Sequence, residues 1–174
     1  MMDLDRIEWM NTYNVITQYI NDVRDLYMNK LQQPDINGWN RIATGNLINS
    51  VKTVINIDGS TIEAALQLDE CWKFIEFGSQ PEGEFKQHWP PVDKIKEWIK
   101  IKPVLPRPDK RGKLPTQDQL AFLIGRKIHD KGTTAYRYLQ QSIDEVNKYY
   151  EQEIENAIAL DLVGMVDNVF KYFK

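Results

Sequence analysis

The chain has 174 residues, of which 42% are hydrophobic and 27% are charged. This length corresponds to about one domain, and the composition is that of a globular protein, which excludes wholesale disorder. The formal net charge of −3 excludes a basic footprint for nucleic acid over the whole protein. Apolar runs are far shorter than the ~20 residues that span a bilayer, and a single cysteine, Cys71, excludes an internal disulfide. We expect a soluble protein with no membrane partner that folds in a reducing cytoplasm.

The N-terminal region predicts a long helix. Apolar residues recur at spacings of three and four from Trp9 to Tyr27 and continue to Leu31. This spacing places them in one stripe along a helix of roughly 28 residues. A short helical segment is expected next, with Thr44 at its cap and its end near Ser50.

The next region predicts an antiparallel hairpin over about residues 51–68. Apolar and polar residues alternate there, as in strands that are buried on one face. Asp58-Gly59-Ser60 forms a favourable turn between the two strands, because Asp-Gly tolerates positive φ. One face of the first strand is predicted to carry Val51, Thr53, Ile55 and Ile57, and one face of the second Ile62, Ala64, Leu66 and Leu68.

Helices are expected again over most of the remaining chain. One or two helical turns fall within residues 71–79, and longer helices cover about 91–101 and 116–130, the last capped by Thr116. A long C-terminal helix is expected from Thr134 onward, with a break near Gly164. Residues 102–115 hold four prolines and five basic residues and predict an exposed, extended loop.

Together these segments predict an α+β fold in a single domain over residues 1–174. A long N-terminal helix is followed by a small antiparallel sheet flanked by helices, and a long C-terminal helix closes the chain. Within this domain, residues 82–133 are expected to be a helical and loop insertion. Residues 161–174 are expected to be an amphipathic C-terminal extension.

The sequence offers few residues for catalysis, and we expect neither an enzyme nor a cofactor. It lacks the nucleophile elbow, the zinc-binding helix, the phosphate-binding loop and the dinucleotide fingerprint. His88 and His129 have no second ligand at metal-binding spacing, so no metal site is expected. Cys71 lies beside Trp72 in an apolar run, which indicates a buried and inert thiol.

One constellation keeps a nuclease open as an alternative. Asp69, followed by Glu84-Phe85-Lys86, loosely matches the acidic residues and lysine that hold Mg²⁺ in a common nuclease class. That chemistry needs Glu84 and Lys86 on a rigid strand, converging with Asp69 on one ion.

The segment from Lys94 to Lys113 is strongly basic. Eight basic residues stand against two acidic ones, a local charge of +6 that leaves −9 for the rest of the chain. Such a bipolar chain suits contact between unlike surfaces, head-to-tail self-contact included. A merely solvated loop and a DNA-binding accessory protein remain alternatives. The candidate partner-contact residues are Lys100, Lys102, Arg107, Lys110, Arg111 and Lys113.

Two motifs flank the predicted hairpin. Residues 45–51 fit the pattern G-x-L-x-x-S-hydrophobic, and residues 74–79 fit aromatic-hydrophobic-Glu-aromatic-Gly-Thr/Ser. Behind a long N-terminal helix, this ordered pair resembles the tailed-bacteriophage neck or tail-completion family, whose members are often labelled minor tail or head–tail joining proteins. The resemblance covers about residues 1–80, with a weaker echo in residues 136–139. The residues that carry it are Gly45, Leu47, Ser50, Glu76, Phe77, Gly78 and Ser79.

The resemblance implies a structural role. Members of this family are α+β subunits that assemble into rings, do no chemistry, and join the portal or connector to the tail. For this chain it implies a ring of six or twelve copies at the head–tail junction of the virion, made in the cytoplasm of the bacterial host. The portal, connector and tail proteins would be its partners, and channel DNA would lie near it without specific contact.

Two residues of the second motif allow local predictions. Gly78 follows an apolar turn, so we expect it to adopt positive φ. Glu76 lies between aromatic residues, so we expect a buried carboxylate that accepts hydrogen bonds from backbone amides of the Thr44–Leu47 turn.

Overall fold

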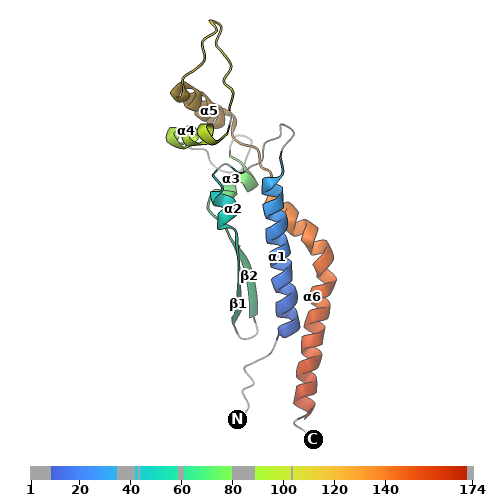
Figure 1. Cartoon of the computed structure of the whole chain (residues 1–174). Coiled ribbons are helices and arrows are strands. Elements are labelled where there is room, and N and C mark those ends of the chain that lie inside the picture. Colours follow the sequence, from blue (N-terminus) through green and yellow to red (C-terminus); the bar gives the residue numbers. More distant parts are fainter. Residues whose placement is uncertain are drawn as a thin grey trace. The chain divides into compact units, whose positions relative to one another are not determined.

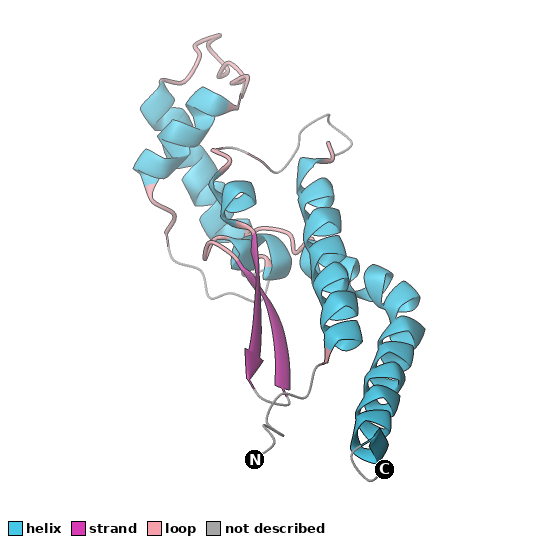
Figure 2. Cartoon of the chain, turned by 60° about the horizontal axis from the view of Figure 1, so that its bottom comes forward, coloured by secondary structure: helices cyan, strands magenta, loops and turns pink. Residues whose placement is uncertain are grey.

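The computed structural model describes residues 9–34, 42, 44–58, 61–79, 89–102 and 104–171. It has the expected α+β architecture, with a long helix near each end and an antiparallel hairpin between them (Figures 1 and 2). In chain order the elements are α1 (Met10–Gln32), α2 (Asn46–Ser50), β1 (Lys52–Asp58), β2 (Thr61–Gln67), α3 (Trp72–Phe77), α4 (Val92–Ile101), α5 (Gln117–Lys131) and α6 (Tyr138–Lys171).

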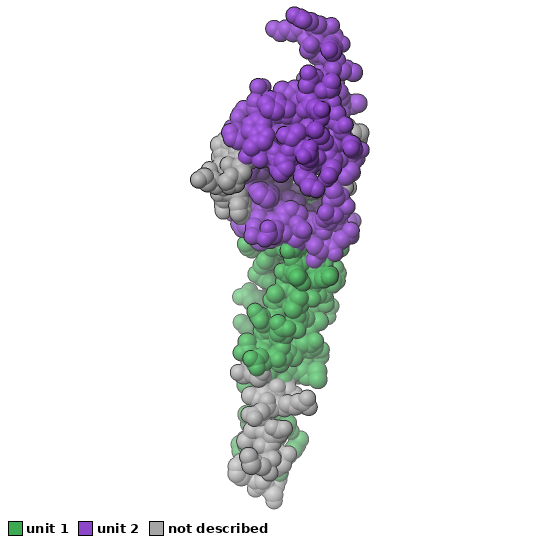
Figure 3. All heavy atoms as spheres, turned by 90° about the vertical axis from the view of Figure 1, so that its left-hand side faces the viewer, with its two compact units in different colours: residues 1–30, 51–68, 139–174 green, residues 31–50, 69–138 purple. Residues whose placement is uncertain are grey.

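The contacts within the chain define two compact units (Figure 3). Unit 1 comprises residues 1–30, 51–68 and 139–174, which contain most of α1, the hairpin and nearly all of α6. Unit 2 comprises residues 31–50 and 69–138, which contain α2 to α5. The expected single domain, the 82–133 insertion and the 161–174 extension stay predictions.

The core of unit 1 lies between α1 and α6, which run side by side (Figures 1 and 2). Val23 of α1 packs with Val146 and Tyr150 of α6, and all three are buried. The Tyr150 hydroxyl donates a hydrogen bond of 2.5 Å to the Asp22 carboxylate. The stripe predicted for the N-terminal helix is therefore the face that α1 buries.

The hairpin pairs in the predicted register. Thr53 lies opposite Leu66, Ile55 opposite Ala64 and Ile57 opposite Ile62, so these residues share one face, on which Ile57 has 55% of its surface exposed. Leu66 packs against the core of unit 1. The turn residues 59 and 60 lie outside the described residues.

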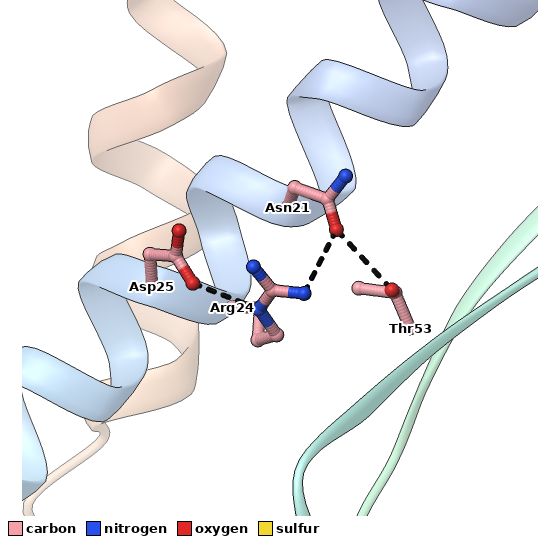
Figure 4. Close-up of polar contacts among 4 residues, drawn as sticks. All are labelled: Asn21, Arg24, Asp25 and Thr53. Atoms are coloured by element: carbon pink, nitrogen blue, oxygen red, sulfur yellow. Dashed lines mark hydrogen bonds and ion pairs between the residues drawn. The ribbon is translucent and has the colours of Figure 1, made fainter.

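A polar contact also joins the hairpin to α1 (Figure 4). The side-chain oxygen of Asn21 accepts a hydrogen bond of 3.2 Å from the Thr53 hydroxyl and one of 3.1 Å from Arg24. Arg24 also forms an ion pair with Asp25 at 2.8 Å. One face of the small sheet is thus held to α1 by both apolar packing and hydrogen bonds.

The C-terminal helix differs from its prediction at two points. It begins at Tyr138 rather than at Thr134, because Arg137 has φ +53° and the preceding backbone donates hydrogen bonds to residues 75 and 76 instead. It also continues through Gly164 to Lys171 without the expected break. A single glycine keeps its backbone hydrogen bonds and costs a helix only about 1 kcal/mol. The packing of the earlier turns of α6 against α1 offsets this cost.

In unit 2, α4 and α5 pack against each other. Small residues of α5 allow the close approach: Ala121 and Gly125 are buried, and a Cβ on Gly125 would lie 3.3 Å from the Ile95 side chain. The start of α5 has the predicted cap, in which the Thr116 hydroxyl and the Gln119 side chain each accept from the other's backbone amide.

Candidate functional site

The first motif closes the base of the hairpin. The Ser50 hydroxyl donates to the carbonyl of Leu47 at 2.7 Å and accepts from the amide of Asp69 at 2.8 Å. Ser50 immediately precedes the hairpin and Asp69 follows it, so one side chain ties the two ends together. Gly45 has φ +80° and its carbonyl accepts the first helical hydrogen bond of α2, from Asn49.

The second motif is locked to the segment before α6. Gly78 has φ +64°, as predicted, and a Cβ there would lie 2.3 Å from the carbonyl oxygen of Thr133. Ser79 and Thr133 exchange backbone hydrogen bonds of 3.1 and 3.2 Å, and their hydroxyls lie 3.0 Å apart. Only a residue without a side chain fits at position 78, so this glycine is a requirement of close backbone packing.

The backbone that follows Thr133 continues this contact. The amide of Tyr136 donates to the carbonyl of Ile75 at 2.9 Å, and that of Arg137 donates to the carbonyl of Glu76 at 3.3 Å. The weaker echo of the family pattern at 136–139 thus begins at the residues that meet the second motif.

Glu76 is buried, with 4% of its surface exposed, as expected for a carboxylate between aromatic residues. The expected hydrogen bonds from the Thr44–Leu47 turn stay a prediction. Phe77 is half-buried, and its ring lies 5.7 Å from that of Trp72.

The two motifs meet at a pocket in unit 2 of about 500 Å³. The first motif contributes Gly45 and Leu47, and the second contributes Phe74 and Ile75. The pocket is open to solvent and lined mainly by apolar groups, a size and character typical of binding sites. The remaining lining residues are Leu31, Ile42, Thr44, Asn46, Ile48, Asp69, Cys71, Lys94, Glu97 and Trp98.

Cys71 corrects one expectation, because it is exposed rather than buried. It stands at the turn before α3, next to the half-buried Trp72. Partial desolvation and the nearby Asp69 carboxylate still raise the pKa of the Cys71 thiol to about 12. A thiol with this pKa is a weak nucleophile at neutral pH.

Asp69 has an ordinary local role. Its carboxylate accepts a hydrogen bond of 3.0 Å from the Cys71 amide, and the hydrogen bonds with Cys71 hold the pKa of Asp69 below its usual value. Glu84 and Lys86, its expected partners in a magnesium site, lie outside the described residues. Within the residues that the structure describes, no three acidic, histidine or cysteine side chains are grouped to hold a metal ion.

The first part of the basic segment, with Lys94, Lys96 and Lys100, lies on α4. Residues 104–115 form an exposed loop, as predicted, that extends beyond α4 and α5 (Figure 1). At its tip the Asp109 carboxylate accepts hydrogen bonds from the amides of Arg111 and Lys113 at 2.8 and 2.9 Å. This turn is a local structure that holds the tip without help from other elements. Of the six partner-contact candidates, Lys102 is half-buried and the rest are exposed: Lys100, Arg107, Lys110, Arg111 and Lys113.

The last third of α6 is apolar but uncovered. Val166 and Phe170 have 52% and 64% of their surfaces exposed, although both lie on a helix whose earlier turns form the core of unit 1. The same stretch exposes Leu160, Leu162, Val163 and Val169. An apolar patch of this kind marks an interaction surface more often than a solvated one.

Sequence reasoning missed two residues that matter here. Thr133 pairs with Ser79 and closes on Gly78, yet nothing in its local pattern points to a residue 54 positions away. Trp98 of α4 lines the pocket, and no motif of the sequence marks it as a site residue.

None of the helices in the described part of the chain is both long and apolar enough to cross a membrane. Comparisons of the chain with protein-family models, with curated proteins and with solved structures find no match.

Proposed function

We propose that this chain is a structural virion protein of a tailed bacteriophage, and that it forms a ring of six or twelve copies at the head–tail junction. In this role it joins the portal or connector to the tail and performs no chemistry. The observation that carries the proposal is the ordered pair of motifs around the hairpin. Each motif is held by its own hydrogen bonds, and residues of both line one pocket.

The uncovered apolar surface supports an assembly role. The exposed side chains of α6 from Leu160 to Phe170 form a face that a second protein surface would bury. Burial of apolar area stabilises an interface by about 25 cal/mol per Å². Identical subunits that contact each other through two different surfaces form a ring when the rotation between neighbours closes, which is the symmetry proposed here.

The basic loop supports contact with a protein rather than a grip on DNA. Apart from this segment the chain carries −9, so a ring made of it would repel the DNA that must slide through its channel. An acidic face on a neighbouring subunit or on the adjoining ring is the better acceptor. Exposed pairs contribute about 0–1 kcal/mol each, but a cluster repeated around a ring sets the register of the joint.

Three-dimensional reconstruction of the virion tests this proposal. The particle that carries this chain is expected to show six or twelve copies at the head–tail junction. Removal of the chain is expected to leave filled heads and separate tails. A reconstruction that finds no copies at the junction would contradict the proposal.

A further inference from the structure

The loop after α4 exposes an apolar side chain that the fold does not use. Leu105 has 89% of its surface exposed. It lies in the sequence Pro103-Val104-Leu105-Pro106-Arg107-Pro108, a P-x-x-P run with an arginine beside it. Prolines at this density favour an extended backbone and lower the entropy that is lost when the segment is bound. Residues 104–108 are here called the arm.

The pocket between the two motifs has the chemistry that such a segment needs. Proline-rich segments bind grooves lined by aromatic side chains, and the pocket offers Trp98 and Phe74 beside Leu47. Phe74 is itself 54% exposed. A volume of about 500 Å³ accommodates several side chains of an extended segment.

The charges of the two surfaces are complementary. The charged residues that line the pocket are Asp69, Glu97 and Lys94, which give it a net negative charge. Lys94 forms an ion pair with Glu97 at 3.1 Å, so Asp69 is the carboxylate without an ion-pair partner among these three residues. The arm carries Arg107 and leads into the basic tip of the loop. Arginine suits this contact because its planar group binds carboxylates through two donors and stacks on aromatic rings.

We infer that the arm of one copy binds in the pocket of a second copy, with Leu105 inserted beside Trp98 and Arg107 at the acidic edge. The arm and the pocket are different surfaces of unit 2, so the contact is head-to-tail and each copy can both give and receive an arm. This inference rests on the proposed function, because it names the contact that would close the ring.

Photo-crosslinking of the full-length protein tests the contact. The photoreactive residue p-benzoylphenylalanine replaces Leu105, and light- and heavy-isotope chains are mixed before irradiation at increasing protein concentration. Mass spectrometry is expected to find links between light and heavy chains that join position 105 to peptides with Leu47, Phe74 or Trp98. The same replacement at Leu114, an exposed residue at the other end of the loop, is the control and is expected to link elsewhere.

Matched variants measure the contribution of the side chain. Leu105→Asp is expected to raise the concentration needed for half-maximal assembly by about tenfold or more, because the contact loses the burial of an apolar side chain. Leu114→Asp introduces the same charge in the same loop and is expected to change that concentration by less than about threefold. Both residues are exposed, so neither variant disturbs the fold.

The outcomes separate this inference from the proposed ring. Assemblies whose links from position 105 stay within one chain or reach other surfaces would overturn the inference and leave the ring intact. A chain that stays monomeric at every concentration, with no links between copies, would also overturn it. The ring itself is decided by the virion reconstruction, which does not depend on this contact.

Discussion

Units 1 and 2 are stabilised in different ways. In unit 1, long helices and a hairpin bury periodic apolar stripes, with Val23, Val146 and Tyr150 at the centre. In unit 2, short elements depend on individual backbone contacts, such as the close approach at Gly78 and the Thr116 cap. We therefore expect substitutions to destabilise unit 1 through lost packing and unit 2 through strained backbone geometry.

The largest effect is expected from a charge in the core of unit 1. Val146 is 6% exposed and Val166, on the same helix, is 52% exposed. Val146→Asp buries a charge without a partner and is expected to lower the free energy of unfolding by about 3–5 kcal/mol. Val166→Asp is expected to change it by less than about 0.5 kcal/mol. Chemical denaturation followed by circular dichroism measures both.

Val146→Ala keeps this comparison measurable if the charged variant fails to fold, with an expected loss of about 1–3 kcal/mol. Equal effects of the Val146 and Val166 substitutions would show that the end of α6 is as much part of the core as its middle. That result would also remove the apolar face from the argument for assembly.

The next effect is expected at a glycine of unit 2. Gly78→Val is expected to cost about 3 kcal/mol, because a Cβ would lie 2.3 Å from the Thr133 carbonyl at a backbone angle of φ +64°. Gly112→Val has almost the same angle, φ +77°, with nothing within 4 Å, and is expected to cost about 1–2 kcal/mol. The difference in melting temperature between the two variants isolates the close contact from the backbone strain.

A smaller and pH-dependent effect is expected at Asp161 in unit 1. Its buried carboxylate accepts hydrogen bonds from the amide and hydroxyl of Thr12 and from the amide and side chain of Asn11, at the start of α1. Burial alone would raise the pKa of Asp161, but these hydrogen bonds outweigh it and lower the pKa below 3.8. The ionised form is therefore favoured in the folded state.

Asp161→Asn is expected to lower the free energy of unfolding by about 1–2 kcal/mol at neutral pH. A lowered folded-state pKa stabilises the fold above the unfolded-state pKa, and this contribution is lost as pH falls through the folded-state pKa. The two proteins should therefore converge in stability as the pH falls below the folded-state pKa of Asp161. Asp167→Asn, at an exposed position of the same helix, serves as the control and should match wild type throughout.

The smallest effect on stability is expected in the basic loop of unit 2. Reversal of Arg107, Lys110 and Arg111 to glutamate should change the free energy of unfolding by less than about 0.5 kcal/mol, because all three are exposed. The same variant should impair the joining of heads to tails, measured as the yield of infectious particles. Normal particles would show that the segment is only a solvated loop.

A charge-matched control keeps that result specific. Reversal of Arg126, Lys127 and Lys148, which are exposed on helices α5 and α6, makes the same change in net charge. It should leave the joining of heads to tails unchanged. An equal defect in both variants would indicate an effect of net charge rather than of the loop.

Much of the fold could be predicted from the sequence, because the periodic spacing of apolar residues indicates the helices and strands. The stripe in α1, the register of the hairpin and the cap at Thr116 are local features of a few residues each. The start of α6 could not be predicted, because Arg137 is held in the left-handed region by a contact with α3, far away in sequence. The α6 helix continues through Gly164, because helical residues on both sides keep the backbone helical at this glycine.

The candidate site could be predicted only in part. The motif residues were found because their order around a hairpin is a sequence feature, and the positive φ at Gly78 follows from its residue type. The pocket could not be found, because its lining comes from four separate segments that only the fold brings together. Cys71 was misplaced because an apolar neighbourhood in sequence does not specify the direction in which each side chain points.

The central claim is that this chain is a ring subunit at the head–tail junction, and a localised virion reconstruction tests it most directly. A tag on the chain, imaged at the neck of the particle, is expected to mark a closed ring of six or twelve copies between the portal or connector and the tail. Density for the chain elsewhere in the particle, or none in it, would contradict the account.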